Sequence, residues 1–293
     1  MRNIILFFLI ITSATANLKP AYPAGKNSYS FNVEKKNIQA QQNRTEKWKP
    51  LFNSKDLNGW IVFIGYRAEN KILHLNKNSQ KVFTVENGEI HFYKNYSEDS
   101  VVPEGFLATE KEYGDFHLKL EFKWGSKKFA QRINNKRNSG IMFLARDTAG
   151  FWPTSVECQV MEGDVGDIYT QNNAWITTTV GSFILDPATR NKIPVYSPDG
   201  KIYNHGGSGS RCLAHDARYD KSERWNTVEI VVKENKARYF VNGKENNRLW
   251  NIRYLNPHDS LDIKPLLKGR ILLQAEATEI YYRNIMIRED QIK

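Results

Sequence analysis

Short runs in which polar and apolar residues alternate make up most of this chain from Trp48 onward. Alternation places successive side chains on opposite faces of an extended strand, so each run predicts a strand with one packed face. No run carries three turns of the apolar periodicity that a helix requires. The sequence therefore predicts an almost entirely β chain, with strands near residues 82–85, 89–93, 115–122, 140–145, 227–232, 237–241, 269–274 and 279–287.

Asn-Gly pairs punctuate two of these runs. Asn87-Gly88 separates 82–85 from 89–93, and Asn242-Gly243 follows 237–241. Asn-Gly is a strong signal for a two-residue hairpin turn, because both residues accept a positive φ. Together with the many aromatic residues (Tyr 14, Phe 15, Trp 7), the hairpins favour a single β-sandwich domain.

The first residues predict the compartment. Arg2 precedes an apolar run over 4–11, and small residues lead to Ala16, which is typical of a signal peptide over 1–16. A polar arm over 17–46 and the sandwich domain over 47–293 complete the predicted organisation. No later run approaches the roughly 20 apolar residues that span a membrane. We expect an exported protein, periplasmic or extracellular, without a membrane span.

The formal net charge of +10 does not by itself indicate a nucleic-acid partner. Lysine and arginine are scattered among acidic residues, and no nucleic-acid motif accompanies them. The sequence predicts a solvated basic surface, with attraction to acidic glycans as the lesser alternative. Of the two cysteines, Cys158 occupies an apolar-facing position, which favours a buried thiol over a disulfide with Cys212.

The run 155–164 carries the main candidates for chemistry. Glu157 and Gln159 project from one face of a predicted strand, while its apolar residues project from the other. A bulge near Met161 would bring Glu162 to the same side as Glu157. Two carboxylates with an amide between them would then line a cleft. This arrangement suits chemistry on a sugar, and a sugar-binding groove would look the same.

Several segments, taken in their order along the chain, resemble those of a known family. The chain resembles the 3-keto-disaccharide hydrolase domain family (DUF1080) over about residues 48–290, through 51–60, 83–90, 107–116, 137–141, the Glu157 strand, 225–226, 241–244 and 283–285. The resemblance implies a concanavalin A-like jelly-roll β-sandwich and activity on glycosides oxidised at C3, an oxidised glycoside or oligosaccharide being the substrate. It also implies that the Glu157 strand lies in the concave cleft. Residues 275–278 stand where relatives often carry a His-Gly turn.

A ketone at C3 acidifies the hydrogen on C2, so a base can remove that proton and the enolate can expel the C1 substituent; water then adds to the enone. Glu157 and Glu162 are the expected acid and base, because mutual repulsion would separate their pKa values. Gln159 would hold a sugar hydroxyl or donate to the enolate.

Five further residues are candidates for substrate binding, and each has a structural alternative. Arg146 would place positive charge at the oxygen or pair with a nearby acid. Glu110 and Asn138 would bind sugar or shape a turn and a strand entry. His205, in a loop-like stretch of the weakly patterned region 163–220, would reach the cleft or stay exposed. Trp175 would form a sugar platform, a role that Trp152 shares, or pack in the core.

A divalent metal ion is left open as a cofactor. Asp164 and Asp167 would offer oxygen ligands of the kind that Ca²⁺ takes, but their spacing does not match an EF-hand loop. A metal that polarised the C3 ketone would suit the proposed chemistry.

Two other functions remain open. Glu157-x-Gln159-x-x-Glu162 resembles the E-x-D-x-x-E strand of laminarinase-like retaining glycosidases, with glutamine in place of the aspartate. Gln159 cannot carry the charge that tunes the nucleophile in that mechanism. A non-catalytic carbohydrate-binding module on the same fold is the second alternative.

Overall fold

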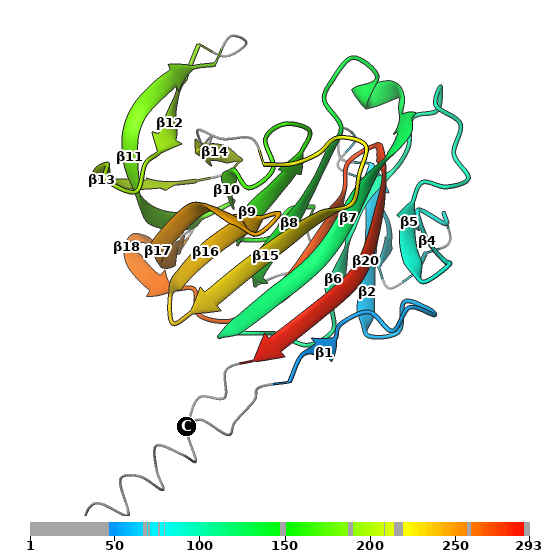
Figure 1. Cartoon of the computed structure of the whole chain (residues 1–293), viewed down its shortest axis with the longest axis horizontal. Coiled ribbons are helices and arrows are strands. Elements are labelled where there is room, and N and C mark those ends of the chain that lie inside the picture. Colours follow the sequence, from blue (N-terminus) through cyan, green and yellow to red (C-terminus); the bar gives the residue numbers. More distant parts are fainter. Residues whose placement is uncertain are drawn as a thin grey trace, which may run out of the picture. The chain divides into compact units, whose positions relative to one another are not determined.

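Two antiparallel β-sheets pack against each other in the computed structural model (Figure 1). The structure describes residues 47–66, 69, 71–75, 77–78, 80–146, 151–186, 190–207, 209–213, 219–256 and 259–289. The chain divides into the units Met1–Thr45 and Glu46–Lys293, and all described residues belong to the second. The predicted signal peptide and polar arm lie outside the described residues, so export stays a prediction.

The larger sheet has twelve strands and the smaller sheet eight. The larger runs in the order β12 (Lys192–Tyr196), β11 (Ala174–Leu185), β17 (Lys244–Asn256), β16 (Lys236–Val241), β15 (Asn226–Lys233), β7 (Phe116–Lys128), β20 (Thr278–Glu289), β5 (Glu89–Phe92), β4 (Phe83–Glu86), with β1 (Lys49–Pro50), β13 (Lys201–Gly206) and β18 (Asp259–Pro265) attached to β20, β11 and β17. The smaller runs β14 (Ser210–Leu213), β10 (Ile168–Gln171), β9 (Ser155–Met161), β8 (Asn138–Ala145), β19 (Arg270–Ala275), β6 (Glu104–Thr109), β2 (Trp60–Tyr66), β3 (Lys71–Leu75).

The predicted all-β sandwich is confirmed. The described residues also include the short 3₁₀ turn η2 (Ala130–Arg132). No helix in the described part of the chain has the length and apolar character needed to cross a membrane.

Strand alternation builds the core between the sheets. On β7 the buried residues Leu118 and Leu120 face inward, opposite Ile230 and Val228 of β15. The smaller sheet contributes Val156, Cys158 and Val160 from β9 to the same core. Cys158 is a buried free thiol, and the Cys212 side chain is outside the description. Because alternate residues point oppositely, Glu157 and Gln159 lie on the outer face of the smaller sheet.

A second apolar cluster covers part of that outer face. Phe63, Phe106, Met142 and Leu272 are fully buried in it, and Trp152 packs against them from the loop before β9. Every residue of β8 is therefore buried, although its alternate side chains point to opposite faces. This cluster forms an apolar surface on the outer face, beside the polar residues of β9.

Both Asn-Gly hairpins form as predicted. Asn87 and Gly88 have φ values of 52° and 77°, and Asn242 and Gly243 have values of 50° and 78°. The flanking pairs Glu86–Glu89 and Val241–Lys244 confirm two-residue turns. The turns fix the registers β4–β5 and β16–β17.

The weak pattern over 163–220 favoured loops over the whole region, and this expectation is wrong, since the region contains β10 to β14. Its strands lack clear alternation because many polar side chains bond across strands. Thr177 Oγ1 donates to Asn204 Oδ1 at 2.7 Å, and Thr178 Oγ1 donates to the carbonyl of Arg248 at 2.7 Å. His205 consequently lies in β13, paired with Ile176, and not in a loop.

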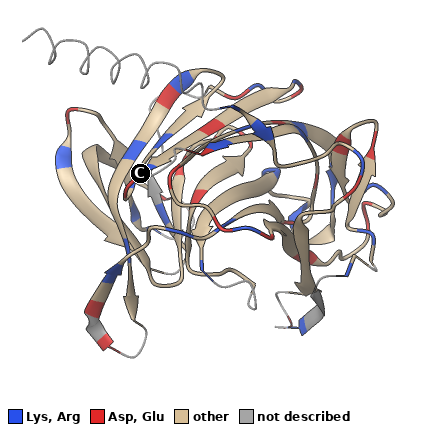
Figure 2. Cartoon of the chain, turned by 90° about the horizontal axis from the view of Figure 1, so that it is seen from below, with Lys and Arg blue, Asp and Glu red and all other residues tan. Residues whose placement is uncertain are grey.

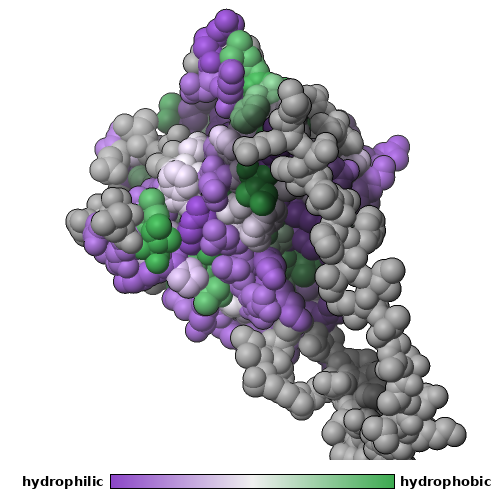
Figure 3. Space-filling view, turned by 90° about the vertical axis from the view of Figure 1, so that its left-hand side faces the viewer, coloured by the Kyte–Doolittle hydropathy of each residue, from purple (hydrophilic) through white to green (hydrophobic). Residues whose placement is uncertain are grey.

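The described surface is mixed in character. Basic and acidic residues are interspersed over strands and loops (Figure 2), as in the Lys119–Glu229 pair at 3.7 Å. On the face shown in Figure 3, hydrophobic side chains form separate areas among hydrophilic ones. Phe183 and Ile202, on β11 and β13, are exposed. The expected lack of a nucleic-acid partner stays a prediction.

The Asn242 turn should matter more to stability than the Asn87 turn. Asn242 Nδ2 donates to the carbonyl of Tyr219 (2.8 Å) and to Asn226 Oδ1 (2.9 Å), and its Oδ1 accepts from Thr227 N (2.9 Å). At about 0.5–1.5 kcal/mol each, these bonds predict that Asn242→Ala lowers the free energy of unfolding by about 2–4 kcal/mol. Asn87→Ala loses only the tolerance of asparagine for the left-handed backbone conformation, so it should lower the free energy of unfolding by about 1 kcal/mol. Equal losses in urea unfolding would contradict this account.

Candidate functional site

A polar cavity of about 460 Å³ opens on the outer face of the smaller sheet. Strands β8, β9, β10 and β19 supply most of its walls, and η2, the β19–β20 turn and two loop residues complete them. The lining residues are Arg132, Asn138, Trp152, Glu157, Gln159, Met161, Tyr169, Gln171, Gly209, Gln274 and Glu276.

Strand β9 forms one wall of the cavity. Glu157 and Gln159 line it at alternate positions, as the sequence predicts, and Met161 continues the same face where a bulge was expected. Antiparallel pairing with β10 places Tyr169 opposite Glu157. Gln171 follows two residues later on the same face, so the neighbouring strand adds a phenol and an amide to the wall.

Glu157 is almost fully buried, with 1% of its surface exposed. Its carboxyl accepts a hydrogen bond from Gln171 Nε2 at 2.8 Å, and no ion pair to it is present among the described residues. Burial raises the pKa of Glu157 to about 8, and the nearby Glu276 carboxylate adds to the rise, while the Gln171 hydrogen bond opposes it. The group can therefore hold or release a proton near neutral pH.

A glycine on β8 makes room for this carboxyl. Gly140 pairs with Gln159 in the adjacent strand. A Cβ at Gly140 would lie 2.0 Å from Glu157 Oε1 and 2.9 Å from Gln274 Oε1. Both distances are far below normal contact, so a side chain here would displace the polar groups of the cavity floor.

A second carboxylate enters the cavity from the β19–β20 turn. Glu276 pairs with Arg132 and accepts a hydrogen bond from Asn138 Nδ2. Arg132 Nε also donates to the Glu276 carbonyl at 3.2 Å, and Gln274 Nε2 approaches Glu276 Oε1 at 3.4 Å. These contacts fix a charged, hydrogen-bonded cluster beside Glu157.

Two amide oxygens of the cavity are without donors in the described part of the chain. Asn138 Oδ1 and Gln274 Oε1 are both buried and unpaired. A buried acceptor without a donor is costly, and a hydroxyl-rich ligand would supply the missing donors. Trp152, partly exposed at the edge of the apolar cluster, adds an aromatic surface. The cavity thus combines the amides, charges and aromatic face that suit a sugar.

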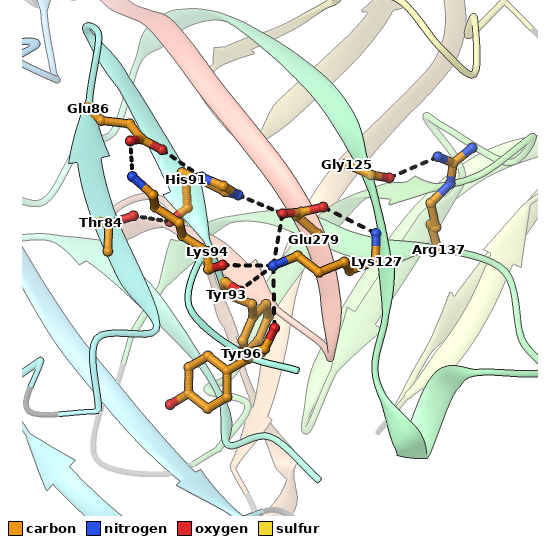
Figure 4. A network of polar contacts seen from close by, with 10 residues as sticks. All are labelled: Thr84, Glu86, His91, Tyr93, Lys94, Tyr96, Gly125, Lys127, Arg137 and Glu279. Carbon is orange, nitrogen blue, oxygen red and sulfur yellow. Dashed lines mark hydrogen bonds and ion pairs between the residues drawn. The ribbon is translucent and has the colours of Figure 1, made fainter. Parts of the chain in front are cut away.

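Strand β20, which follows Glu276, has its first residues in a second polar network (Figure 4). Glu279 lies 2.8 Å from His91 Nε2 and accepts from Lys127 N at 3.1 Å. Burial raises the pKa of Glu279, but the His91 and Lys127 hydrogen bonds outweigh it, and the pKa is lowered overall. Ala277 N also donates to Tyr93 Oη at 3.1 Å. The β20 side of the turn that presents Glu276 is therefore anchored.

The expected partnership of Glu157 with Glu162 is wrong. The pairing of β9 with β8 is regular from Asn138–Met161 to Phe143–Val156, so the bulge predicted near Met161 is absent. Glu162 instead bonds Arg137 Nη2 at 2.7 Å outside the cavity. That hydrogen bond lowers the pKa of Glu162.

Arg146 and Glu110 also lie away from the cavity. Arg146 follows β8 at its other end, where its guanidinium stacks 3.8 Å from the centre of the Tyr254 ring. Glu110 is exposed, and its main chain bonds Gly59 and Arg270. The contacts of Glu110 therefore agree with the alternative prediction, in which it shapes a turn.

Of the remaining candidates, only Asn138 lines the cavity. His205 is half-buried on β13, where burial lowers its pKa, and its Nε2 has no partner among the described residues. Trp175 lies against Gly206 on the neighbouring strand. Of the two tryptophans considered for a sugar platform, Trp152 lines the cavity and Trp175 does not.

The two aspartates considered for a metal are held by basic side chains. Arg211 Nε donates to Asp167 Oδ2 at 2.8 Å, and Arg211 lies 3.3 Å from Asp164 Oδ1. Lys136 also pairs with Asp164. These residues do not fit a cation site, and no cluster of three or more His, Cys, Asp or Glu side chains suited to a metal occurs within the described ranges.

Sequence reasoning missed Arg132, Tyr169, Gln171, Gln274 and Glu276. The one local signal was at 275–278, where Glu276 lies in the segment for which the resemblance implied a His-Gly turn.

The raised pKa of Glu157 predicts a stability that depends on pH. The folded chain keeps this proton up to about pH 8, so its stabilising contribution is full below the unfolded pKa of about 4.5 and is lost as pH rises. Glu157→Gln should therefore gain stability relative to the native chain between pH 5 and pH 9, by an amount on the order of a few kcal/mol. Thermal melting measures this difference.

Glu162→Gln is the matched control. Because the pKa of Glu162 is lowered by Arg137, its contribution is present above its unfolded pKa and lost as pH falls. This variant should be less stable than the native chain at pH 7 and approach it in acid. Parallel pH profiles for the two variants would contradict both assignments.

Comparison with known proteins supports the fold and gives the family. A protein from Parabacteroides distasonis ATCC 8503, a proposed glycosyl hydrolase, matches with a TM-score of 0.50 and 17% identity over 86% of this chain and 97% of that one. A second from the same organism matches with a TM-score of 0.47 and 23% identity, over 83% of this chain and 100% of that one. A search of curated proteins gave no significant match. The model of the 3-keto-α-glucoside 1,2-lyase-like domain matches residues 47–288, and the chain belongs to that family.

Proposed function

We propose that this chain is an exported carbohydrate-active enzyme that cleaves 3-keto-glycosides through removal of the C2 proton, elimination of the C1 substituent and hydration. Family membership supports action on carbohydrate. The observation that carries the proposal is the Glu157 carboxyl, buried in the wall of a polar cavity with one amide donor. Such a group suits repeated proton transfer near neutral pH.

In the first step the ionised Glu157 takes the C2 proton of the sugar. The electron pair of the C2–H bond forms the enolate with the C3 ketone. Gln159 lies two residues along β9 on the same face, and its Oε1 already accepts from Val160 N at 3.0 Å. Its NH₂ group is therefore the donor side of this amide, and it stabilises the enolate oxygen.

In the second step the enolate reforms the ketone and a C1–C2 double bond, and the C1 oxygen leaves. Glu157 returns its proton to that oxygen. Water then attacks C1, gives a proton to Glu157, and Glu157 passes it to C2. The atoms balance as 3-keto-glycoside plus water giving an alcohol and a 3-keto sugar.

The Arg132–Glu276–Asn138 cluster positions the sugar in this proposal. Glu276 is held by Arg132 and Asn138, so it serves as an acceptor for hydroxyl groups. Asn138 Oδ1 and Gln274 Oε1 accept further hydroxyls, and Trp152 covers an apolar ring face. Fixed groups of this kind lower the entropic cost of reaching the reactive geometry.

No step here passes through a metal ion, and a chelator in the assay tests the divalent cofactor that the sequence leaves open. The retaining-glycosidase alternative requires a second catalytic acid at Glu162, which bonds Arg137 instead. A binding module without turnover remains an outcome of the experiment that follows.

Purified protein should release p-nitrophenol from the 3-keto-glucoside and not from the plain glucoside. Glu157→Gln should lower kcat by about 10²–10⁴-fold, the usual contribution of a proton-transfer group. Glu162→Gln, which changes an acid outside the cavity, should keep kcat within about threefold of the native value. Release from the plain glucoside would favour a glycosidase, and binding without release a binding module.

The pH dependence of kcat/KM gives a separate prediction. Because Glu157 must lose its proton to act as the base, and its pKa is about 8, kcat/KM should rise with pH and level off above about pH 8. A profile that falls across the same range would show that the protonated carboxyl is required, and would overturn the assignment of Glu157 as base.

A further inference from the structure

A second cavity, of about 370 Å³, lies at the other end of β8 and β9 from Asn138. Its walls come from the ends of β8 and β17, the residue before β9, the β10–β11 turn and β18. The lining residues are Arg146, Thr154, Asn173, Tyr254, Leu255, Asn256, Asp262 and Lys264.

The charges of this cavity do not cancel. Lys264 Nζ pairs with Asp262 at 3.0 Å, and Asn256 Nδ2 also donates to Asp262 at 3.0 Å. Arg146 is exposed, and it has no ion pair with any acid in the part of the chain that the structure describes. One positive charge is therefore left over, and it belongs to a guanidinium that lines the cavity.

The stacking of Arg146 on Tyr254 favours recognition of an anion. With the ring centre 3.8 Å away, one face of the guanidinium is covered and its orientation is restricted. The N–H groups at its edge can then bind two oxygens of a carboxylate or sulfate together. Thr154 and Asn173 line the same cavity with neutral groups that can bond the hydroxyls of a sugar.

The two cavities are neighbours along the chain at two places. Trp152 and Gln171 line the first, and Thr154 and Asn173 line the second. Two residues of extended chain reach at most about 7 Å. Asn172 Nδ2 donates to the Trp152 carbonyl and ties the two segments together. One oligosaccharide can therefore reach from the first cavity into the second.

We propose that the second cavity binds the carboxylate or sulfate of an acidic sugar, next to the sugar unit held at Glu157. The assignment of that first unit rests on the proposed function. The substrate class becomes an anionic oligosaccharide, and Arg146 becomes the residue that selects it.

Titration of the full chain with glucuronic acid, glucose 6-sulfate and glucose at low salt, followed by NMR, tests the proposal. At least one acidic sugar should bind about tenfold or more tighter than glucose, as expected for a charge-assisted hydrogen bond. Tighter binding of glucuronic acid would identify a carboxylate as the preferred group, and tighter binding of glucose 6-sulfate would identify a sulfate. Added salt should reduce the preference, because Arg146 is exposed.

Three variants complete the experiment. Arg146→Met keeps the aliphatic stem and should abolish the preference for acidic sugars. Arg248→Met, at an exposed arginine of β17 outside both cavities, should retain it. Glu157→Gln should also retain it, so that loss of turnover and loss of anion binding are separate results. Equal binding of the three sugars, or a preference that survives Arg146→Met, would overturn the proposal.

Discussion

Burial of the Glu157 carboxyl in the middle of a packed sheet is the constraint on which the site depends. Strand β9 cannot shift to expose it, because Val156, Cys158 and Val160 anchor the other face in the core. Gly140 on the neighbouring strand β8 leaves the space that the carboxyl occupies, and Gln171 supplies one hydrogen bond in place of water. Desolvation disfavours the charged form, and the same packing that holds the sandwich together sets the chemistry of its acid.

The local parts of this arrangement could be predicted from the sequence. Alternation along 155–161 separates Glu157 and Gln159 from the core residues, because strand geometry has a period of two. The Asn-Gly pairs predict two hairpins for an equally local reason, since both residues tolerate positive φ. The all-β class follows from the same patterns. Each of these inferences depends on residues only a few positions apart.

The parts that failed depend on contacts between distant segments. Arg132 and Glu276 are separated by 144 positions, and the pairing of β19 with β8 brings the Glu276 turn to within one strand of β9. Glu162 has suitable spacing from Glu157, but it bonds Arg137. Arg137 immediately precedes β8, the strand that pairs with β9. Arg146 was expected near Glu157, although antiparallel pairing carries the end of β8 to a different cavity. Periodicity predicts which face of a strand a side chain lies on, but it does not predict which strands lie beside that strand.

Deuterium incorporation at C2 tests the central claim most directly. The protein is incubated with a 3-keto-glucoside in D₂O, and the product is followed by NMR early in the reaction. If Glu157 transfers the C2 proton, the 3-keto product carries deuterium at C2 as it forms, and Glu157→Gln lowers the rates of cleavage and exchange together by about 10²–10⁴-fold. Cleavage with hydrogen fully retained at C2, or exchange at the native rate in Glu157→Gln, would contradict the account.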